Sequence, residues 1–141
     1  MKRLRSQRGA ALLETAITLP ILLLVSVSIF EFGRAYQTWQ VLTNAAREGA
    51  RIAVLPGTTD ADVATRVRTY MTNGQLSNAS SATVTLDRSV TLTGSDTGSR
   101  VLISYPFQFI VLNPVAKLVT SGSTLGAPIT MQASALMRNE S

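Results

Sequence analysis

An uninterrupted apolar run near the N-terminus is the feature that most limits what this chain can fold into. The run reads AALLETAITLPILLLVSVSIF from Ala10 to Phe30, 21 residues in which Glu14 is the only ionisable side chain. As a helix rising about 1.5 Å per residue, it would extend about 31 Å, close to the thickness of the hydrocarbon core of a bilayer. Pro20 lies inside the run, and an interior proline is tolerated in a membrane helix. The run therefore predicts one membrane-spanning helix over residues 10–31.

Basic side chains are concentrated just before this run. The chain of 141 residues has a formal net charge of +5, but from Gly9 onward nine basic residues face eight acidic ones. The other four basic residues all precede Gly9: Lys2, Arg3, Arg5 and Arg8. Positive charge on a short flank keeps that flank in the cytoplasm, so these four residues predict a cytoplasmic N-terminus and an extracytoplasmic C-terminal part. A basic tip does not favour nucleic-acid binding, which needs a basic surface on the folded domain.

The composition argues against most catalytic and metal-binding sites. The sequence has no cysteine and no histidine, which removes the usual zinc ligands, cysteine nucleophiles and histidine acid–base groups. It has no glycine-rich phosphate loop, and Lys117 is the only lysine after Lys2 to serve as a base for a serine or threonine. Asp60 and Asp62 are most simply acids in the first turn of a helix. We expect no enzyme activity, no metal, no cofactor and no small-molecule substrate.

After Phe30 the apolar pattern becomes amphipathic. Large apolar side chains recur every three or four positions with polar ones between them: Phe32, Tyr36, Trp39 and Leu42. Pro56 and Gly57 end the pattern. We therefore expect the helix to continue through residues 32–55, with this stripe of four side chains packed on the rest of the chain. Tyr36 and Trp39 could instead form an interfacial aromatic belt.

Residues 56–141 carry the signals of a small head. Thr59 or Asp60 is a typical N-cap, and an apolar face that ends at Gly74 predicts a short helix over about 60–73. Alternating β-branched residues then predict antiparallel strands between about 83 and 137, with a turn over 94–99 and a strand end at Pro106. The expected fold class is α+β: a long N-terminal helix, half membrane-spanning and half amphipathic, packed on a small antiparallel sheet.

Three motifs, in order, carry a family resemblance. The segment RGAALLE from Arg8 to Glu14 resembles the processing site of type IV prepilins, in which prepilin peptidase cuts after a glycine and a glutamate becomes the fifth mature residue. The wider stretch from Arg8 to Arg51 is similar to the TadE-like pseudopilins, minor pilins of the tight-adherence secretion system. It shares with them this site, the box EFGR that begins at Glu31 and the box NAAREGAR that begins at Asn44. Alanine at the first mature position fits the minor-pilin branch rather than classical pilins.

The resemblance implies a type IV pilin-like fold and a set of roles. Residues 1–9 would be a leader removed by cleavage between Gly9 and Ala10. Glu14 would neutralise the new α-amine of Ala10 in a neighbouring subunit and so set the axial register. The implied partners are the inner membrane, prepilin peptidase, other pilin or pseudopilin subunits and the assembly platform. The implied location is the bacterial inner membrane, with the head in the periplasm, or a pilus filament.

Two alternatives remain open from the residues alone. An uncleaved single-pass anchor would keep Met1 and use its head to bind an unrelated partner. A secreted binding module would instead be released after Ser28, with Ser26-Val27-Ser28 as a small-x-small cleavage site. The first residue of the mature chain separates the three cases, since it would be Ala10 in a pilin, Met1 in the anchor and Ile29 in the secreted module.

Overall fold

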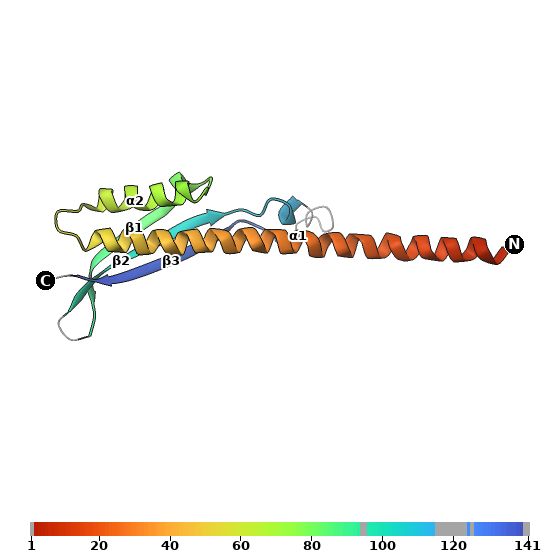
Figure 1. Cartoon of the computed structure of the whole chain (residues 1–141), viewed down its shortest axis with the longest axis horizontal. Helices are drawn as coiled ribbons and strands as arrows, with labels where there is room; N and C mark the ends of the chain where they lie inside the picture. Colours follow the sequence, from red (N-terminus) through yellow and green to blue (C-terminus); the bar gives the residue numbers. More distant parts are fainter. Residues whose placement is uncertain (1, 94–95, 115–123, 125, 140–141) are drawn as a thin grey trace. The chain divides into compact units, whose positions relative to one another are not determined.

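The chain builds two helices and a three-stranded sheet. This computed structural model describes residues 2–93, 96–114, 124 and 126–139. The elements follow the order α1 (Lys2–Ala53), α2 (Asp60–Asn73), the 3₁₀ turn η1 (Ala79–Ser81), β1 (Thr83–Thr91), β2 (Thr97–Phe107) and β3 (Ile129–Arg138) (Figure 1). The predicted α+β architecture is confirmed, because a long N-terminal helix packs on an antiparallel sheet of order β1-β2-β3.

The chain divides into two compact units, which are described separately. One unit contains residues 1–34 and 109–126, and the other contains residues 35–108 and 127–141. Helix α1 contributes to both. It begins at Lys2 rather than at Ala10, where the apolar run starts. The difference has a simple cause, since lysine, arginine, leucine and glutamine before Gly9 all have good helix propensity and nothing there breaks the helix.

In the first unit, residues 9–26 of α1 are mostly apolar and all exposed. Side chains from Leu12 to Val25 project outward around the helix, and α1 is long and apolar enough to cross a membrane. Four hydroxyl groups bond back to the carbonyl oxygen four residues earlier, at 2.7–2.9 Å: those of Thr15, Thr18, Ser26 and Ser28. These bonds keep the hydroxyls paired within the helix, as a lipid environment requires.

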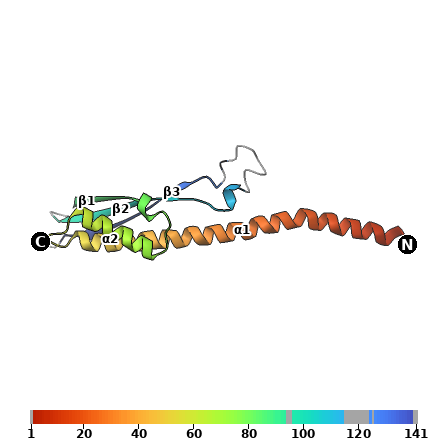
Figure 2. The ribbon, with the colours of Figure 1, turned by 90° about the horizontal axis from the view of Figure 1, so that it is seen from above.

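Pro20 lies inside α1 and does not end it. A proline has no N–H to donate to the carbonyl four residues earlier, and its ring crowds that carbonyl. Figure 2 shows α1 curving in its red-orange N-terminal part. An interior proline is a usual cause of such a bend.

In the second unit, the C-terminal part of α1 and helix α2 lie on the same face of the sheet (Figures 1 and 2). The side chains that fill this layer are fully buried and come from all three parts: Leu42, Ala45, Ala46, Ala50, Val63, Val67, Met71, Val101 and Ile103. A Cβ placed on Gly49 would lie 2.5 Å from Cγ2 of Val67 on α2 and 3.3 Å from Cγ1 of Val101 on β2. Gly49 therefore marks a point where α1, α2 and the sheet approach closely.

Helix α2 occupies the same range as the helix predicted from the sequence. Thr59 is its N-cap, with a reciprocal capping box: Asp62 N donates to Thr59 Oγ1 at 3.2 Å, and Thr59 N donates to Asp62 Oδ2 at 3.0 Å. Gly74 follows the last residue of the helix, but the left-handed conformation belongs to Gln75, with a φ of 62°. Gly74 is needed for space instead, because a Cβ there would lie 2.5 Å from Cγ1 of Val41.

Strand β2 begins earlier than the sequence indicates and does not stop at Pro106. It begins at Thr97, so the turn expected over 94–99 is shorter, and residues 94–95 lie outside the described part of the chain. It also continues through Pro106 to Phe107, where Pro106 pairs with Thr130 of β3. Strand β1 reaches only as far as Ser104 along β2. On the side of β2 that faces β1, no strand in the described part of the chain lies beside Pro106, so its missing N–H removes no hydrogen bond between strands. This is why a proline is accepted in this strand.

Arg88 connects the sheet to the end of α1. It lies in a register irregularity of β1 between Asp87 and Val90. Its guanidinium donates to the carbonyl oxygen of Ala53, the last residue of α1, and to the carbonyl oxygen of Thr58 at 2.9 Å. It also donates to Asp60 Oδ1 at 3.0 Å. A helix C-terminus leaves carbonyl groups without intrahelical partners, and Arg88 satisfies one of them.

The predicted packing stripe is wrong for three of its four residues. Leu42 is fully buried, but Phe32, Tyr36 and Trp39 are 66%, 61% and 46% exposed. A helix turns by about 100° per residue, so Tyr36, six positions before Leu42, points about 120° away from it. The buried face is formed instead by Leu42 and small residues, because a helix can approach a sheet and a second helix closely only where its side chains are short.

Gly49 and Gly33 provide a matched test of this close approach. We expect Gly49→Ala to lower the free energy of unfolding by about 1 to 3 kcal/mol, because Val67 is β-branched and cannot easily move its methyl group aside. Gly33→Ala is the control, since no atom lies within 4 Å of a Cβ there. It should be neutral or stabilising by up to about 1 kcal/mol. Urea unfolding of the full chain in detergent, followed by Trp39 fluorescence and circular dichroism, measures both. Equal effects of the two substitutions would contradict the packing argument.

Candidate functional site

All three motifs of the sequence analysis lie on α1, and the first is the segment around Gly9. Gly9 and Ala10 are both exposed and lie within the helix. No atom lies within 4 Å of a Cβ built on Gly9, so the fold of this chain gives no packing reason for a glycine there. Glycine weakens a helix by about 1 kcal/mol relative to alanine. The peptide bond after Gly9 is therefore exposed and close to the helix start, at a position where the helix opens more easily.

The four basic residues of the N-terminus precede this segment on the same helix. Lys2, Arg3, Arg5 and Arg8 fall within the first turns of α1, and their side chains lie outside the described part of the structure. Their role in fixing the orientation of the protein in a membrane stays a prediction.

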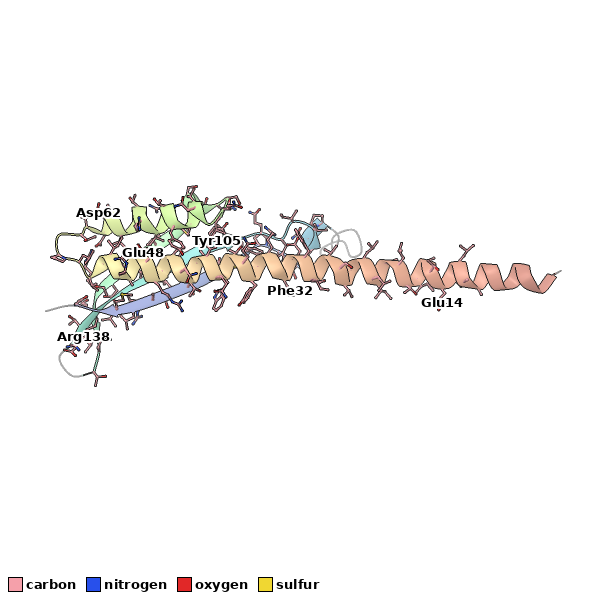
Figure 3. The ribbon with its side chains drawn as sticks, in the orientation of Figure 1. Glu14, Phe32, Glu48, Asp62, Tyr105 and Arg138 are labelled. Carbon is pink, nitrogen blue, oxygen red and sulfur yellow. The ribbon has the colours of Figure 1, made fainter. Side chains whose placement is uncertain are left out.

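Glu14 lies on the exposed apolar surface of α1, one turn after Ala10 (Figure 3). None of the ion pairs formed among the described side chains includes it. Its neighbours along the surface are apolar or bear hydroxyls that already bond to the helix backbone, such as Thr15 and Thr18. A carboxylate in such surroundings is costly unless a partner from outside the chain compensates it.

The second motif, EFGR, places a buried carboxylate at the end of the apolar run. Glu31 is 1% exposed. Its Oε1 accepts a hydrogen bond from the backbone N–H of Val111 at 2.6 Å, and its Oε2 accepts one from the Arg34 guanidinium at 3.1 Å. Glu31 thus fastens the segment that follows β2 to α1. The sequence analysis assigned Glu31 no role of its own. An acidic residue directly after an apolar run, with an arginine three positions later, is a pattern that could have indicated one.

The third motif, NAAREGAR, is where α1 packs against the rest of its unit. Ala45, Ala46 and Ala50 are fully buried, and Gly49 allows the close approach described above. Glu48 accepts hydrogen bonds from two arginines, Arg51 on α1 at 2.9 and 3.0 Å and Arg66 on α2 at 2.9 and 3.1 Å. These two guanidinium groups lower the pKa of Glu48 to about 2. The motif therefore serves the packing of the two helices.

Metal and cofactor sites were not expected from the sequence. Within the described residues, no group of three or more acidic side chains is arranged to hold a metal ion. The absence of catalytic, metal and cofactor sites from the whole chain stays a prediction.

The comparisons with known proteins find a match on the same helix. The family model described as TadE-like protein matches residues 9–51, which lie within α1 and contain the second and third motifs and all of the first except Arg8. The resemblance seen in the sequence is thus confirmed over about a third of the chain. No curated protein and no solved structure matches this chain. The match ends at Arg51, close to the end of α1, and does not include α2 or the sheet.

Glu48 makes the stability of the fold depend on pH. Its pKa is about 2 in the folded chain against 4.5 as the ordinary value, so its contribution is present above pH 4.5 and is lost as the pH falls toward 2. Arg51 and Arg66 are half exposed, so we expect a contribution of only about 1 to 2 kcal/mol at pH 7. Urea unfolding at pH 6 and pH 3 should therefore show a smaller change for Glu48→Gln than for the parent.

An exposed ion pair gives the control for this measurement. Asp96 and Arg138 form a pair at 3.2 Å with both side chains largely exposed, so Asp96→Asn should cost less than about 0.5 kcal/mol at pH 6. If Glu48→Gln and the parent lose the same stability between pH 6 and pH 3, the Glu48 cluster does not hold the two helices together.

Proposed function

We propose that this chain is a prepilin-like minor pilin subunit of a tight-adherence pilus or secretion apparatus. The observation that carries the proposal is the match to TadE-like proteins along one helix in which residues 9–26 are mostly apolar and exposed. In this role the chain is inserted in the bacterial inner membrane with its N-terminus in the cytoplasm and its head on the periplasmic side. It is cut after Gly9 and assembled through α1. The role is structural and involves no catalysis by this chain.

The exposed apolar surface of α1 supports the proposal that the subunit moves from a bilayer into a filament. Soluble monomers rarely expose a continuous apolar surface of this extent. A bilayer would cover it while the subunit is stored in the membrane, and the helices of other subunits would cover it in a filament. The second unit, which includes the C-terminal part of α1 and is called the head from here on, has its own buried core. The head can therefore fold while the apolar part of α1 stays in the membrane.

The geometry at Gly9 supports cleavage by prepilin peptidase. A protease needs an extended backbone at the scissile bond, whereas residues 9 and 10 are helical, so the start of α1 has to unwind locally. Gly9 lowers the cost of that step, and the helix loses only its first turns. Lys2, Arg3, Arg5 and Arg8 would hold the leader at the cytoplasmic surface, where the enzyme would meet it.

Glu14 supports assembly through a charge pair between subunits. Removal of residues 1–9 creates a positive α-amine on Ala10, at the end of an apolar helix. In the assembly, Glu14 of one subunit would face the α-amine of its neighbour, and each group would compensate the other away from water. The pair then fixes how far one helix is displaced along the next. Other pilin subunits and the assembly platform are the partners that this arrangement requires.

Substitution of Gly9 tests the cleavage step. We expect Gly9→Val to block processing, because it adds bulk at the scissile bond. Gly9→Ala should be processed more slowly, by about fivefold if unwinding limits the reaction, since about 1 kcal/mol of helix stability is added. Intact-mass measurement of the membrane-extracted protein shows whether residues 1–9 have been removed.

The same helix supplies the control. Gly33→Val makes the same change at a position where a Cβ has no contact within 4 Å, and it should be processed normally. A Gly9→Val chain that still lacks residues 1–9 would rule out prepilin peptidase. A parent chain that begins at Met1 would instead identify an uncleaved anchor, and one that begins at Ile29 a secreted module.

Substitution of Glu14 tests the assembly step. Glutamine keeps the size of glutamate and removes its charge, so Glu14→Gln isolates the proposed ion pair. We expect normal insertion, cleavage and folding, but poor co-purification with other pilin subunits, because an unpaired buried charge costs about 3 to 5 kcal/mol. Thr18→Val, one turn further along the same surface, should co-purify normally. If Glu14→Gln co-purifies as well as the parent, Glu14 has no role in assembly, and if it is missing from the membrane, its role lies in insertion.

A further inference from the structure

The segment that follows β2 is apolar and belongs to the same unit as the apolar part of α1. It reads FIVL over residues 109–112, and Ile110 is 59% exposed. The compact unit that contains residues 1–34 also contains residues 109–126. A single exposed isoleucine is common on protein surfaces and indicates nothing by itself. Whether Ile110 could contact a membrane depends on where along α1 this segment is held.

Glu31 determines that position. Its carboxylate accepts the N–H of Val111 at 2.6 Å and is itself almost completely buried, so the segment is fixed to α1 at the residue that follows the apolar run. The end of the segment is fixed as well, because Asn113 Nδ2 donates to the carbonyl oxygen of Gly126 at 2.8 Å. Gly126 has a φ of 69°, and a Cβ there would lie 2.7 Å from the backbone nitrogen of Asn113.

The length of α1 relates this position to the bilayer. If the run from Ala10 to Phe30 fills the hydrocarbon core, Glu31 lies at the boundary of the core, and the headgroup region extends about 5 to 7 Å beyond it. Ile110 precedes the residue that is hydrogen-bonded to Glu31, so it lies within about one helical turn of that boundary. Trp39 is nine residues beyond Phe30, or about 13 Å, and so falls outside the headgroup region.

The distribution of charge agrees with this position. No charged residue occurs between Arg100 and Lys117, a stretch that includes the whole segment. A charged group in the segment would have to be dehydrated at the membrane boundary. The one carboxylate near this boundary, that of Glu31, is covered by the segment and compensated by Arg34.

We propose that residues 109–112 form a second membrane contact, in which Ile110 inserts into the interfacial region of the same bilayer that α1 crosses. Glu31 is the positioning residue, because it holds the segment at the depth where the apolar run ends. The proposal rests on the membrane crossing that is part of the proposed function, and lipid is the partner to which it commits.

Fluorescence quenching by brominated lipids tests this contact in the full chain. Trp39 is the only tryptophan of the chain, so Trp39→Phe provides a background without tryptophan fluorescence. In that background, Ile110→Trp and two control variants are each reconstituted in two kinds of vesicle, whose lipids carry bromine on the acyl chains either near the headgroup or near the bilayer centre. Leu22→Trp, within the apolar run, is the positive control, and Thr85→Trp, at an exposed position of β1, is the negative one.

We expect the Ile110→Trp chain to emit at shorter wavelength than Thr85→Trp. It should lose fluorescence in vesicles brominated near the headgroup to an extent close to that of Leu22→Trp in vesicles brominated near the bilayer centre. If only Leu22→Trp is quenched, α1 crosses the membrane and the second contact is refuted. A blue-shifted emission without quenching would mean that protein covers Ile110, which also refutes it. If Leu22→Trp is not quenched either, both the membrane crossing and the contact are wrong.

A second pair of variants tests the role of Glu31. Added to Ile110→Trp, Glu31→Gln keeps an oxygen that can accept the Val111 N–H, so quenching should persist. Glu31→Ala removes the acceptor and should reduce quenching at position 110 while leaving that of Leu22→Trp unchanged. Circular dichroism shows whether each variant is folded. Equal quenching of the Gln and Ala variants would show that Glu31 does not position the segment.

Discussion

The close approach of α1 to α2 and β2 at Gly49 is the contact on which the fold of the head depends. A side chain there would collide with Val67 and Val101, and the alanines around it are buried for the same reason. Short side chains bring the two helices near enough for Glu48 to reach Arg66 on α2 as well as Arg51 on α1. One helical segment thereby supplies both a close packing contact and an ion-pair cluster between the two helices, and the family match ends where this segment ends.

The sequence allowed the elements to be predicted better than their contacts. The range of α2 followed from a capping box and an apolar face, which are local features, and the membrane-spanning run followed from its length and composition. The packing of Phe32, Tyr36 and Trp39 could not be predicted in the same way. An apolar spacing of three or four residues defines a stripe on a helix, but it does not say whether large or small residues face the partner. Here the small ones do, and the aromatic rings are left outside.

The contacts that the sequence did not reveal join residues far apart in the chain. Glu31 meets Val111 and Arg88 meets Ala53, and in each pair one partner is a backbone group. Every residue except proline has a backbone N–H and every residue has a C=O, so the sequence does not indicate which backbone group a side chain will contact. Pro106 is a similar case, because a proline inside a strand is acceptable only where the neighbouring strand has already ended, and that end depends on the register of the sheet. Of the site residues, Gly9 and Glu14 came from the family resemblance, and their roles require partners outside the chain.

The continuity of α1 also has a mechanical consequence. The helix that would be held in a membrane or a filament is also the helix whose C-terminal part packs against α2 and the sheet. A pull on the head is therefore transmitted along α1 and acts parallel to the surface that the helix shares with α2 and the sheet. In that direction the packed side chains, the Glu48 cluster and the bond from Arg88 to the helix end resist together, whereas a load that peeled the sheet away from α1 would break them one after another. The packing within the second unit should therefore resist a load parallel to α1 better than a load that separates the sheet from the helix.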